Sequence, residues 1–268
     1  MNTTQKITAL VVVVGVALST IVTAETDEEN KNASRNLPDS EFHFTRLVYK
    51  DYGSIGFGFR RGRGSWTVDM PEAEFHLSQG LRRLTRLDVE PVSRYTAEGG
   101  RWLQLSDNEI FNYPWLYAVE VGNWYLDDME AARLREYLLR GGFLMVDDFH
   151  GTREWAGFLE SMKRAFPDRP ILEIPDSDEV LHVLYDLDQR IQIPGISPIM
   201  RGRTWERDGT MPHWRGIYDN DARLMVAINF NMDLGDAWEH ADDPRYPEPM
   251  TALAYRFAVN YVIYAMTH

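Results

Sequence analysis

The sequence predicts an α/β protein with a doubly wound, mostly parallel sheet and helices on both faces. Short apolar runs alternate along the chain with amphipathic segments of helical periodicity, which is the pattern of this fold class. One run, Phe143 to Val146 (FLMV), is wholly apolar. Such a run is typical of a strand that is buried on both faces inside a parallel sheet.

The elements of the first half follow from apolar spacing and from turn residues. Asp69 is expected to cap a helix that has Pro71 in its first turn and an apolar face at Ala73, Leu77, Leu81 and Leu84. The predicted strands of this half are Phe44–Tyr49, Leu87–Val92, Arg101–Leu105 as part of a hairpin, and the buried Trp115–Val121.

The second half carries clearer helix signals. Asp127 and Glu130 form a capping-box pattern, and Gly141-Gly142 ends the helix that they begin. Further helices are predicted for the apolar face from Trp155 to Phe166, ended by Pro167, and for Pro249–Met266, which is apolar almost all round and expected against the sheet. Ile171–Ile174 and Leu224–Phe230 are predicted strands.

The amino-acid composition excludes several classes of partner and of active site. The chain has 268 residues, and 28 basic against 41 acidic side chains give a formal charge of −13. This charge repels phosphate backbones, so a nucleic-acid partner is not expected. The chain has no cysteine, which excludes disulfides, thiolate metal sites, iron–sulfur clusters and cysteine nucleophiles.

The first residues predict export. Lys6, an apolar run over Ala9–Leu18 and the small residues Val22-Thr23-Ala24 fit a secretory signal cleaved after Ala24. An uncleaved anchor is the alternative, although Ile7–Val22 is short for spanning a bilayer. We therefore expect a signal peptide over 1–24, a flexible polar leader over 25–41 and one domain over 42–268. The mature chain is expected in the periplasm or outside a bacterial cell, without a membrane span.

Candidate site residues lie in the loops that leave the predicted strands, because ligands of open α/β sheets bind beyond the carboxyl ends of the strands. The first group is Asp147-Asp148-x-His150. Asp148 and His150 are candidate catalytic acid/base residues, and Asp147 and Asp148 are candidate ligand or metal contacts. The alternative is structural: Asp148 or Thr152 caps the next helix while Asp147 meets an arginine.

A second group follows Leu224–Phe230. Asn231, Asp233 and Asp236 are candidate ligand contacts, and a divalent metal held by Asp147, Asp233 and His240 is a further hypothesis. Alternatively, Asp236 caps a short turn. No H-E-x-x-H zinc signature is present, and no cofactor is specified.

The remaining candidates are an arginine and three indoles. The glycine-rich loop Gly53–Gly64 contains Arg61, which is suited to an anionic group; a mobile loop whose arginines offset nearby acids is the alternative. The loop lacks the glycine fingerprints of nucleotide sites. Trp66, Trp124 and Trp238 are candidate stacking surfaces for a sugar-like ligand, with core packing as the alternative.

Four segments carry a family resemblance: WTVDMPEAEFH (66–76), IFNYPWLY (110–117), LREYLLRGGFLMVDDFHG (134–151) and NMDLGDAWEHADD (231–243). Together they resemble the bacterial family named domain of unknown function 4159, over roughly 42–268. The resemblance implies a flavodoxin-like fold of the class I glutamine amidotransferase-like superfamily. Members of that superfamily carry a cysteine at the strand-to-helix turn where Asp147-Asp148 stand here, so the resemblance implies the fold without amidotransferase chemistry.

These observations favour an exported protein that binds a polar, sugar-like or anionic ligand at a rim of Asp, His and Trp side chains. A metal-assisted hydrolase and a structural scaffold in a secreted assembly are the alternatives. The separation of the Asp148 and Asp233 carboxylates decides whether the loops meet, because two carboxylates within roughly 4–6 Å perturb each other's pKa.

Overall fold

A seven-stranded, mostly parallel sheet forms the centre of the computed structural model, which describes residues 39–51 and 64–268. The strand order is β3-β1-β4-β6-β9-β8-β7. Strand β8 alone runs opposite to the other six strands. The strands are β1 (Thr45–Val48), β3 (Arg101–Gln104), β4 (Trp115–Val119), β6 (Phe143–Asp147), β7 (Leu172–Glu173), β8 (His213–Tyr218) and β9 (Leu224–Phe230), and β2 (Lys50–Asp51) and β5 (Trp124–Tyr125) form a separate antiparallel ribbon.

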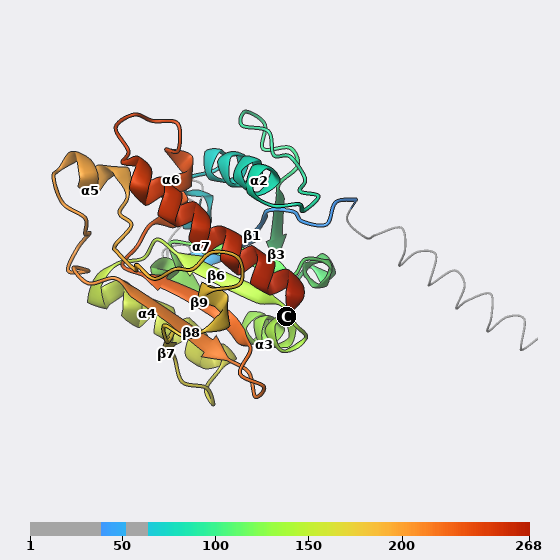
Figure 1. Cartoon of the computed structure of the whole chain (residues 1–268). Coiled ribbons are helices and arrows are strands. Elements are labelled where there is room, and N and C mark those ends of the chain that lie inside the picture. Colours follow the sequence, from blue (N-terminus) through green and yellow to red (C-terminus); the bar gives the residue numbers. More distant parts are fainter. Residues whose placement is uncertain (1–38, 52–63) are drawn as a thin grey trace, which may run out of the picture. The chain divides into compact units, whose positions relative to one another are not determined.

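Helices cover both faces of the sheet (Figure 1). One face carries α2 (Glu72–Leu84), α6 (Leu234–Glu239) and α7 (Glu248–Thr267), and the other carries α3 (Asp128–Leu139) and α4 (Gly151–Ala165). The short helix α5 (Ile196–Met200) lies between α4 and β8 in the chain. Single 3₁₀ turns are η2 (Ser65–Thr67), η3 (Asn108–Asn112), η4 (Val121–Asn123) and η5 (Glu179–Leu181). The predicted doubly wound α/β fold is thus confirmed.

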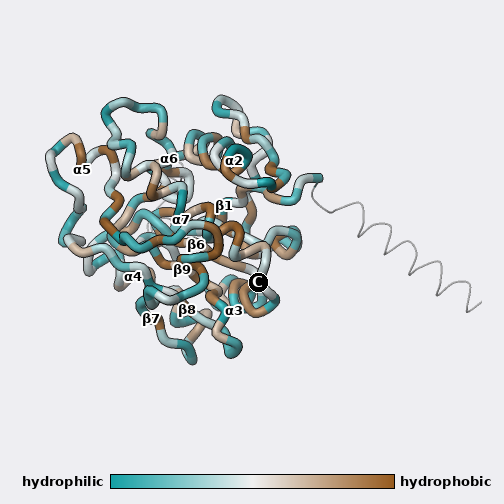
Figure 2. The backbone as a smooth tube through the Cα atoms, viewed as in Figure 1, coloured by the Kyte–Doolittle hydropathy of each residue, from teal (hydrophilic) through white to brown (hydrophobic). Residues whose placement is uncertain are grey.

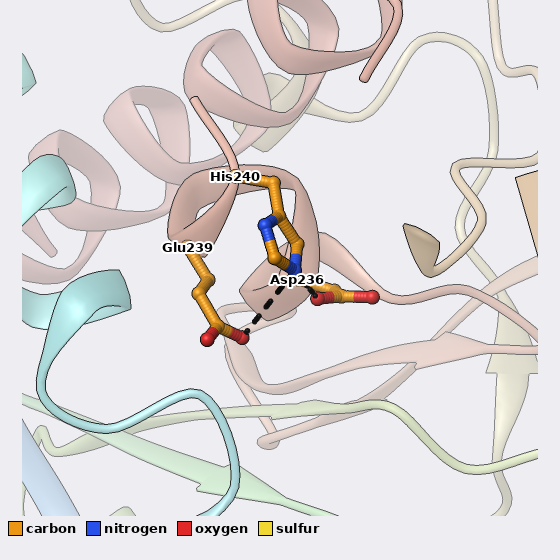
Figure 3. Close-up of side chains that lie close together, drawn as sticks. All are labelled: Asp236, Glu239 and His240. Carbon is orange, nitrogen blue, oxygen red and sulfur yellow. Dashed lines mark ion pairs between the residues drawn. The ribbon is translucent and has the colours of Figure 1, made fainter. Parts of the chain in front are cut away.

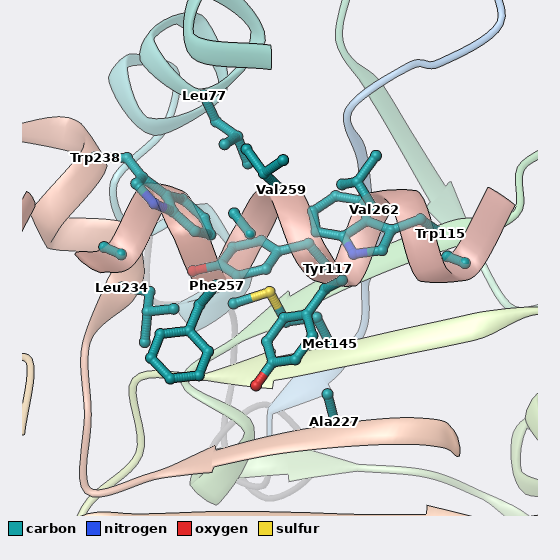
Figure 4. Close-up of a cluster of buried hydrophobic side chains, with 14 of the residues drawn as sticks. Leu77, Trp115, Tyr117, Met145, Ala227, Leu234, Trp238, Phe257, Val259 and Val262 are labelled. Carbon is teal, nitrogen blue, oxygen red and sulfur yellow. The ribbon is translucent and has the colours of Figure 1, made fainter. Parts of the chain in front are cut away.

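Two hydrophobic cores lie on the two faces of the sheet. The first packs α2, α6 and α7 onto aromatic side chains of β4, where Trp115 and Tyr117 stack with ring centroids 5.9 Å apart (Figure 4). The second packs α3 and α4, with Trp124 stacked on Phe158. Apolar positions gather in the middle of the fold and polar ones outside (Figure 2). Residues 40–268 group into one unit.

Helix α7 lies against the sheet, as its sequence predicts. Phe257, Val259 and Tyr261 are fully buried in the first core, and Asn260 bonds the carbonyls of Val180 and Tyr185. These contacts satisfy the one polar side chain in the middle of its apolar surface. Within the described ranges, no helix is both long and apolar enough to cross a membrane.

The capping box of α3 is also confirmed. Asp127 accepts from the Glu130 amide at 2.9 Å, and the Glu130 carboxylate accepts from the Asp127 amide at 3.0 Å. Gly141 has φ +109°, so the helix ends where a glycine can take the left-handed backbone that other residues avoid.

Two predictions about strands are wrong, and one strand is missing from the predictions. Arg101–Leu105 forms no hairpin, because β3 pairs in parallel with β1, with Thr45 opposite Arg101. Leu87–Val92 makes only one bridge, between Val89 and Phe42. Strand β8 has no counterpart among the predictions. Its sequence HWRGIY mixes polar, aromatic and glycine residues, and its pairing with β9 gives it a strand conformation that its own pattern does not indicate.

Several predictions fall outside the described residues. These are the signal peptide over 1–24, the leader up to residue 38, and Arg61.

Candidate functional site

Three aspartates from distant segments meet at the carboxyl edge of the sheet, the edge where β1, β4, β6 and β9 end. Asp148 follows β6, Asp233 follows β9, and Asp69 precedes α2. One carboxylate oxygen from each lies within 4.8 Å of the other two. The expectation that the loops after β6 and β9 bring Asp148 and Asp233 together is therefore confirmed. We call these three residues the aspartate cluster.

The aspartate cluster concentrates negative charge away from water. Asp148 and Asp233 are only 8% and 5% exposed. Burial, and then the charges of neighbouring carboxylates, raise the pKa of all three groups well above the usual value for aspartate. Within the described ranges, no lysine or arginine forms an ion pair with any of them. The cluster therefore needs protons or a cation to offset its charge.

Arg46 is a buried cation whose charge acts on Asp69. It is fully buried, and its Nε lies 2.5 Å from Glu74 Oε1. Its Nη1 donates to the carbonyls of Trp66 and Val68. Its charge lowers the pKa of Asp69 but does not cancel the larger effect of burial. Arg46 is thus committed to Glu74 and to the chain segment that carries Asp69.

A second group of ligand-type side chains consists of Asp236 and Glu239 of α6 and His240 directly after it (Figure 3). His240 Nε2 lies 3.0 Å from Asp236 Oδ1 and 3.9 Å from Glu239 Oε2. The charge of Asp236 contributes to the raised pKa of each member of the aspartate cluster. The two groups therefore belong to one continuous acidic site.

Gly195 lies beside one carboxylate of each group, Asp233 of the aspartate cluster and Asp236 of the second group. A methyl group at this position would lie 2.7 Å from Asp233 Oδ2 and 2.8 Å from Asp236 Oδ2. Glu206 Oε1 would be 3.5 Å away. Three carboxylates thus surround the position of a side chain that Gly195 does not have.

Asp147 has a different role from the predicted one. Its Oδ2 accepts from the amides of Leu234 and Gly235 at 2.8 and 2.9 Å and from the Tyr117 hydroxyl at 3.2 Å. It holds the start of α6, and it pairs with no arginine of residues 39–51 and 64–268. The predicted metal set of Asp147, Asp233 and His240 is therefore not assembled, because the side chain of Asp147 is directed to the helix amides.

Asp233 also begins α6. Its Oδ1 accepts from the Asp236 amide at 2.8 Å, so Asp233 is the cap and the alternative that assigned this role to Asp236 is wrong. Asp236 Oδ2 instead accepts from the Ile196 amide at 2.5 Å. Asp233 Oδ2 stays directed toward Gly195. One carboxylate thus serves both the helix and the site.

The side chain of His150 contacts Asp148. His150 Nε2 lies 3.0 Å from Asp148 Oδ1, and the imidazole is 2% exposed. Burial lowers the pKa of His150 to about 4, so the ring is neutral near pH 7. Among the described residues, Nδ1 has no hydrogen-bond partner. The ring therefore holds the Asp148 carboxylate through its Oδ1.

The start of α4 is closed by acceptors from three segments. The amide of His150 donates to Glu154 Oε2 at 2.6 Å, that of Gly151 to Asn231 Oδ1 at 2.8 Å, and that of Thr152 to Asp208 Oδ1 at 3.0 Å. Neither Asp148 nor Thr152 caps the helix, contrary to that alternative. Asn231, predicted as a ligand contact, is used here and in a bond to the Met211 carbonyl.

The backbone is strained around this edge. Among the described residues, seven that are not glycine have positive φ, and five of them border the site: Asp69, Glu120, Asp148, Arg207 and Asn231. Aspartate and asparagine tolerate this conformation better than glutamate and arginine do. Such strain is concentrated at functional sites, because surrounding structure must hold it in place.

Comparison with protein families identifies the chain. The profile described as "Domain of unknown function (DUF4159)" matches residues 43–266. The chain belongs to this family. No match to a curated protein was found. The family description assigns no activity, so the function of this DUF4159 protein has to be argued from the site itself.

The donor set of the DUF4159 site suits a hard divalent cation. Carboxylate oxygens are the ligands that Mg²⁺, Mn²⁺ and Ca²⁺ prefer, and the aspartate cluster offers only such oxygens. The chain has no thiolate to offer. The hydrogen bonds at the start of α4 also favour a cation over an anion. The amides there already donate to Glu154, Asn231 and Asp208, and an anion would have to displace these side chains.

The predicted aromatic contacts of this DUF4159 protein are mostly core residues. Trp124 and Trp238 are fully buried, so the structure places them in the two cores rather than at a ligand. Trp66 is partly buried, and its carbonyl accepts from Arg46. A tryptophan in or beside a loop that follows a strand can therefore be a core residue as well as a ligand contact, and its position in the sequence does not distinguish the two.

Sequence reasoning missed Asp69, Glu120, Glu206 and Arg207 as site residues. Asp69 was assigned to the cap of α2, but that helix begins at Glu72 and its capping position, Pro71, has no side-chain bond. Glu120 directly follows β4, and a residue that follows a strand of this sheet is a candidate site residue by the rule used for Asp148 and Asp233. Glu206 and Arg207 follow no strand and belong to no recognisable motif.

Proposed function

We propose that this protein binds a divalent cation at Asp69, Asp148 and Asp233 and uses it in a hydrolytic reaction. One observation carries the proposal: three carboxylate oxygens from three distant segments lie within 4.8 Å of one another, with no lysine or arginine of the described ranges paired to them. Burying like charges together costs stability unless a counter-charge is present. A cation supplies that charge and explains why the chain keeps the arrangement.

The residues around the cluster support hydrolysis. A divalent ion held by these carboxylates would lower the pKa of a bound water and so supply a nucleophile near neutral pH. Glu239 lies beside Asp69, and burial and the charge of Asp236 raise its pKa. A carboxylate whose pKa is raised toward neutrality is suited to accept a proton. His150 holds Asp148 in a fixed orientation.

The binding of a sugar-like ligand without catalysis is less well supported. That interpretation relied on indoles at the rim, and two of the three are buried in the cores. A relation to amidotransferase-like folds stays part of the proposal. It is supported by Asp148, which has φ +49° at the turn between β6 and α4.

Calorimetric titration with Mn²⁺ after treatment with a chelator tests the cation site. We expect saturable binding by the wild-type protein, weakened by about tenfold or more in Asp148→Asn and Asp69→Asn, since each removes one charged ligand. The exposed Asp188→Asn is the matched control and should bind as the wild type does. Absence of heat, or equal affinity in all variants, would contradict the site.

A panel of chromogenic phosphate, carboxylate and glycoside esters tests hydrolysis. Turnover that requires Mn²⁺ and is lost in Asp148→Asn supports the reaction. Mn²⁺ binding without turnover of any ester would restrict the protein to a binding function.

Export remains part of the proposal and rests on the sequence of residues 1–24. N-terminal sequencing of the protein purified from periplasm and medium should find Glu25 as the first residue. An intact Met1 in all fractions would contradict cleavage.

A further inference from the structure

We propose that Arg207 binds an oxyanion group of the substrate, a phosphate or a carboxylate, next to the cation site. This inference rests on the proposed function and names the substrate class that the site would accept. Arg207 lies in the segment between α5 and β8, and the next residue, Asp208, accepts from the Thr152 amide at the start of α4.

A short chain of contacts joins Arg207 to the aspartate cluster. Its Nη2 lies 2.6 Å from Glu154 Oε1. The other oxygen of Glu154 accepts from the His150 amide at 2.6 Å, and His150 Nε2 lies 3.0 Å from Asp148 Oδ1. The guanidinium is thus fixed one acidic side chain away from Asp148.

Arg207 differs from Arg46 in its accessibility. The side chain of Arg207 is 43% exposed and that of Arg46 is fully buried. Of these two arginines, Arg207 is therefore the one whose N–H groups a molecule from solvent can reach. Its Nη1 lies 3.8 Å from Glu206 Oε2, beyond hydrogen-bond distance, so this nitrogen can still donate to a ligand. A guanidinium presents its donors as a planar fork, which matches a phosphate or carboxylate and can bind two of its oxygens at once.

The segment that carries Arg207 is held by the two residues that follow it. Asp208 accepts from the amide and hydroxyl of Thr152, and the carbonyl of Gly209 accepts from Gln192 Nε2. Arg207 itself has φ +47°, a conformation that costs energy for an arginine. The fold thus maintains a strained backbone to place this side chain beside the site.

Charge predicts how an anion would bind there. The carboxylates of the site repel an anion as long as no cation neutralises them. Oxyanion binding at Arg207 should therefore depend on the metal, and by linkage the oxyanion should tighten metal binding by the same factor.

The test measures Mn²⁺ affinity with and without inorganic phosphate, and with and without acetate, by electron paramagnetic resonance of free Mn²⁺. We expect one or both anions to tighten Mn²⁺ binding by about tenfold, a usual size for coupling between two ligands. A response to phosphate alone, or to acetate alone, identifies which oxyanion the site accepts.

Variants locate the effect. Arg207→Gln should bind Mn²⁺ without anion at least as tightly as the wild type, because it removes a positive charge that acts on Asp148, and it should lose the tightening by the anion. Arg207→Lys should keep part of the tightening because lysine lacks the fork. Arg140→Gln is the matched control: Arg140 is exposed, pairs with Glu136, and lies at the end of α3, beside the start of β6. Circular dichroism checks that each variant folds.

Each result decides the matter. Mn²⁺ binding with no anion effect in the wild type, or with the same effect in Arg207→Gln, would overturn the role of Arg207 and leave the proposed cation site intact. No Mn²⁺ binding at all would overturn the proposed function and this inference with it.

Discussion

The two edges of the sheet differ in how their acidic side chains are neutralised. At the amino edge, where α4 ends and β9 begins, carboxylates are paired with arginines. Asp168 accepts from both terminal nitrogens of Arg135 at 2.7 and 2.9 Å, and this hydrogen bonding lowers the pKa of Asp168 to about 2. At the carboxyl edge, Asp69, Asp148 and Asp233 face one another, and their pKa values are raised.

The contrast distinguishes carboxylates that stabilise the folded state from carboxylates that destabilise it and are kept in place by the surrounding structure. Paired carboxylates at the amino edge lower the energy of the folded state. Unpaired ones at the carboxyl edge raise it, and a cluster kept at such a cost indicates a function.

The largest expected effect is on the pH dependence of the metal-free protein. Burial raises the pKa of Asp147 and of Glu120 to about 8, well above their usual values. The folded state therefore holds more protons than the unfolded state between about pH 4 and pH 8, so stability should fall as pH rises through that window. A single group with such a shift changes the free energy of unfolding by several kcal/mol.

Urea denaturation at pH 5 and pH 8 in the presence of a chelator measures this effect. Asp168, whose pKa is about 2 in the folded state, is ionised in the folded and almost wholly in the unfolded state from pH 5 to pH 8, and it contributes almost no slope between these two measurements. A stability that rises from pH 5 to pH 8 would show that the acids of the carboxyl edge are better neutralised than the contacts indicate.

The second prediction concerns the amino edge. Arg223→Ala should lower the free energy of unfolding by about 3 kcal/mol, because it leaves Asp219 without its partner and removes bonds to the carbonyls of Leu138 and Gly142. Urea denaturation at pH 7 measures the loss. The exposed Arg140→Ala should cost less than about 1 kcal/mol. An equal loss in the free energy of unfolding in the two variants would contradict the view that the half-buried pair of Arg223 stabilises the fold more than the surface pair of Arg140.

The third prediction has the opposite sign. Asp148→Asn should raise the stability of the metal-free protein at pH 8 by about 1–2 kcal/mol, because it removes one charge from the aspartate cluster and keeps the size of the side chain. Thermal unfolding with chelator at pH 8 measures the gain. A clear loss of stability would mean that the Asp148 charge is satisfied in the folded state.

The smallest effect tests an acid of the carboxyl edge that is satisfied. Asp127 caps α3 in a complete capping box. Asp127→Ala should cost about 1 kcal/mol, measured by urea denaturation at pH 7. If this substitution stabilised the protein instead, repulsion would extend over the whole edge and would not be confined to the aspartate cluster.

The part of the site that could be predicted is the part fixed by strand polarity. Asp148 and Asp233 follow apolar strands, and parallel strands end at the same edge, so their meeting follows from the fold class. Asp147, one residue earlier, points to the α6 amides because alternate residues of a strand face opposite sides. Sequence alone did not indicate which of the two neighbours faces the site.

The rest depends on packing between distant segments. Asp69 has the spacing expected of a helix cap, and only the packing of α2 against α6 directs its carboxylate toward Asp148. Arg207 lies in a segment with little regular structure, where no periodicity fixes the direction of a side chain. The burial of Trp124 and Trp238 depends on contacts across the sheet faces, which the local sequence does not encode.

The closed start of α4 limits how this scaffold can be redesigned. A thiol at position 148 would lie beside three amides that already have acceptors, two of them carboxylates from Glu154 and Asp208. A developing oxyanion would meet negative charge there and none of these three amides would be free to receive it. Engineering acyl transfer into this turn would therefore begin with the neutralisation of its acidic neighbours, and the nucleophile would come afterwards.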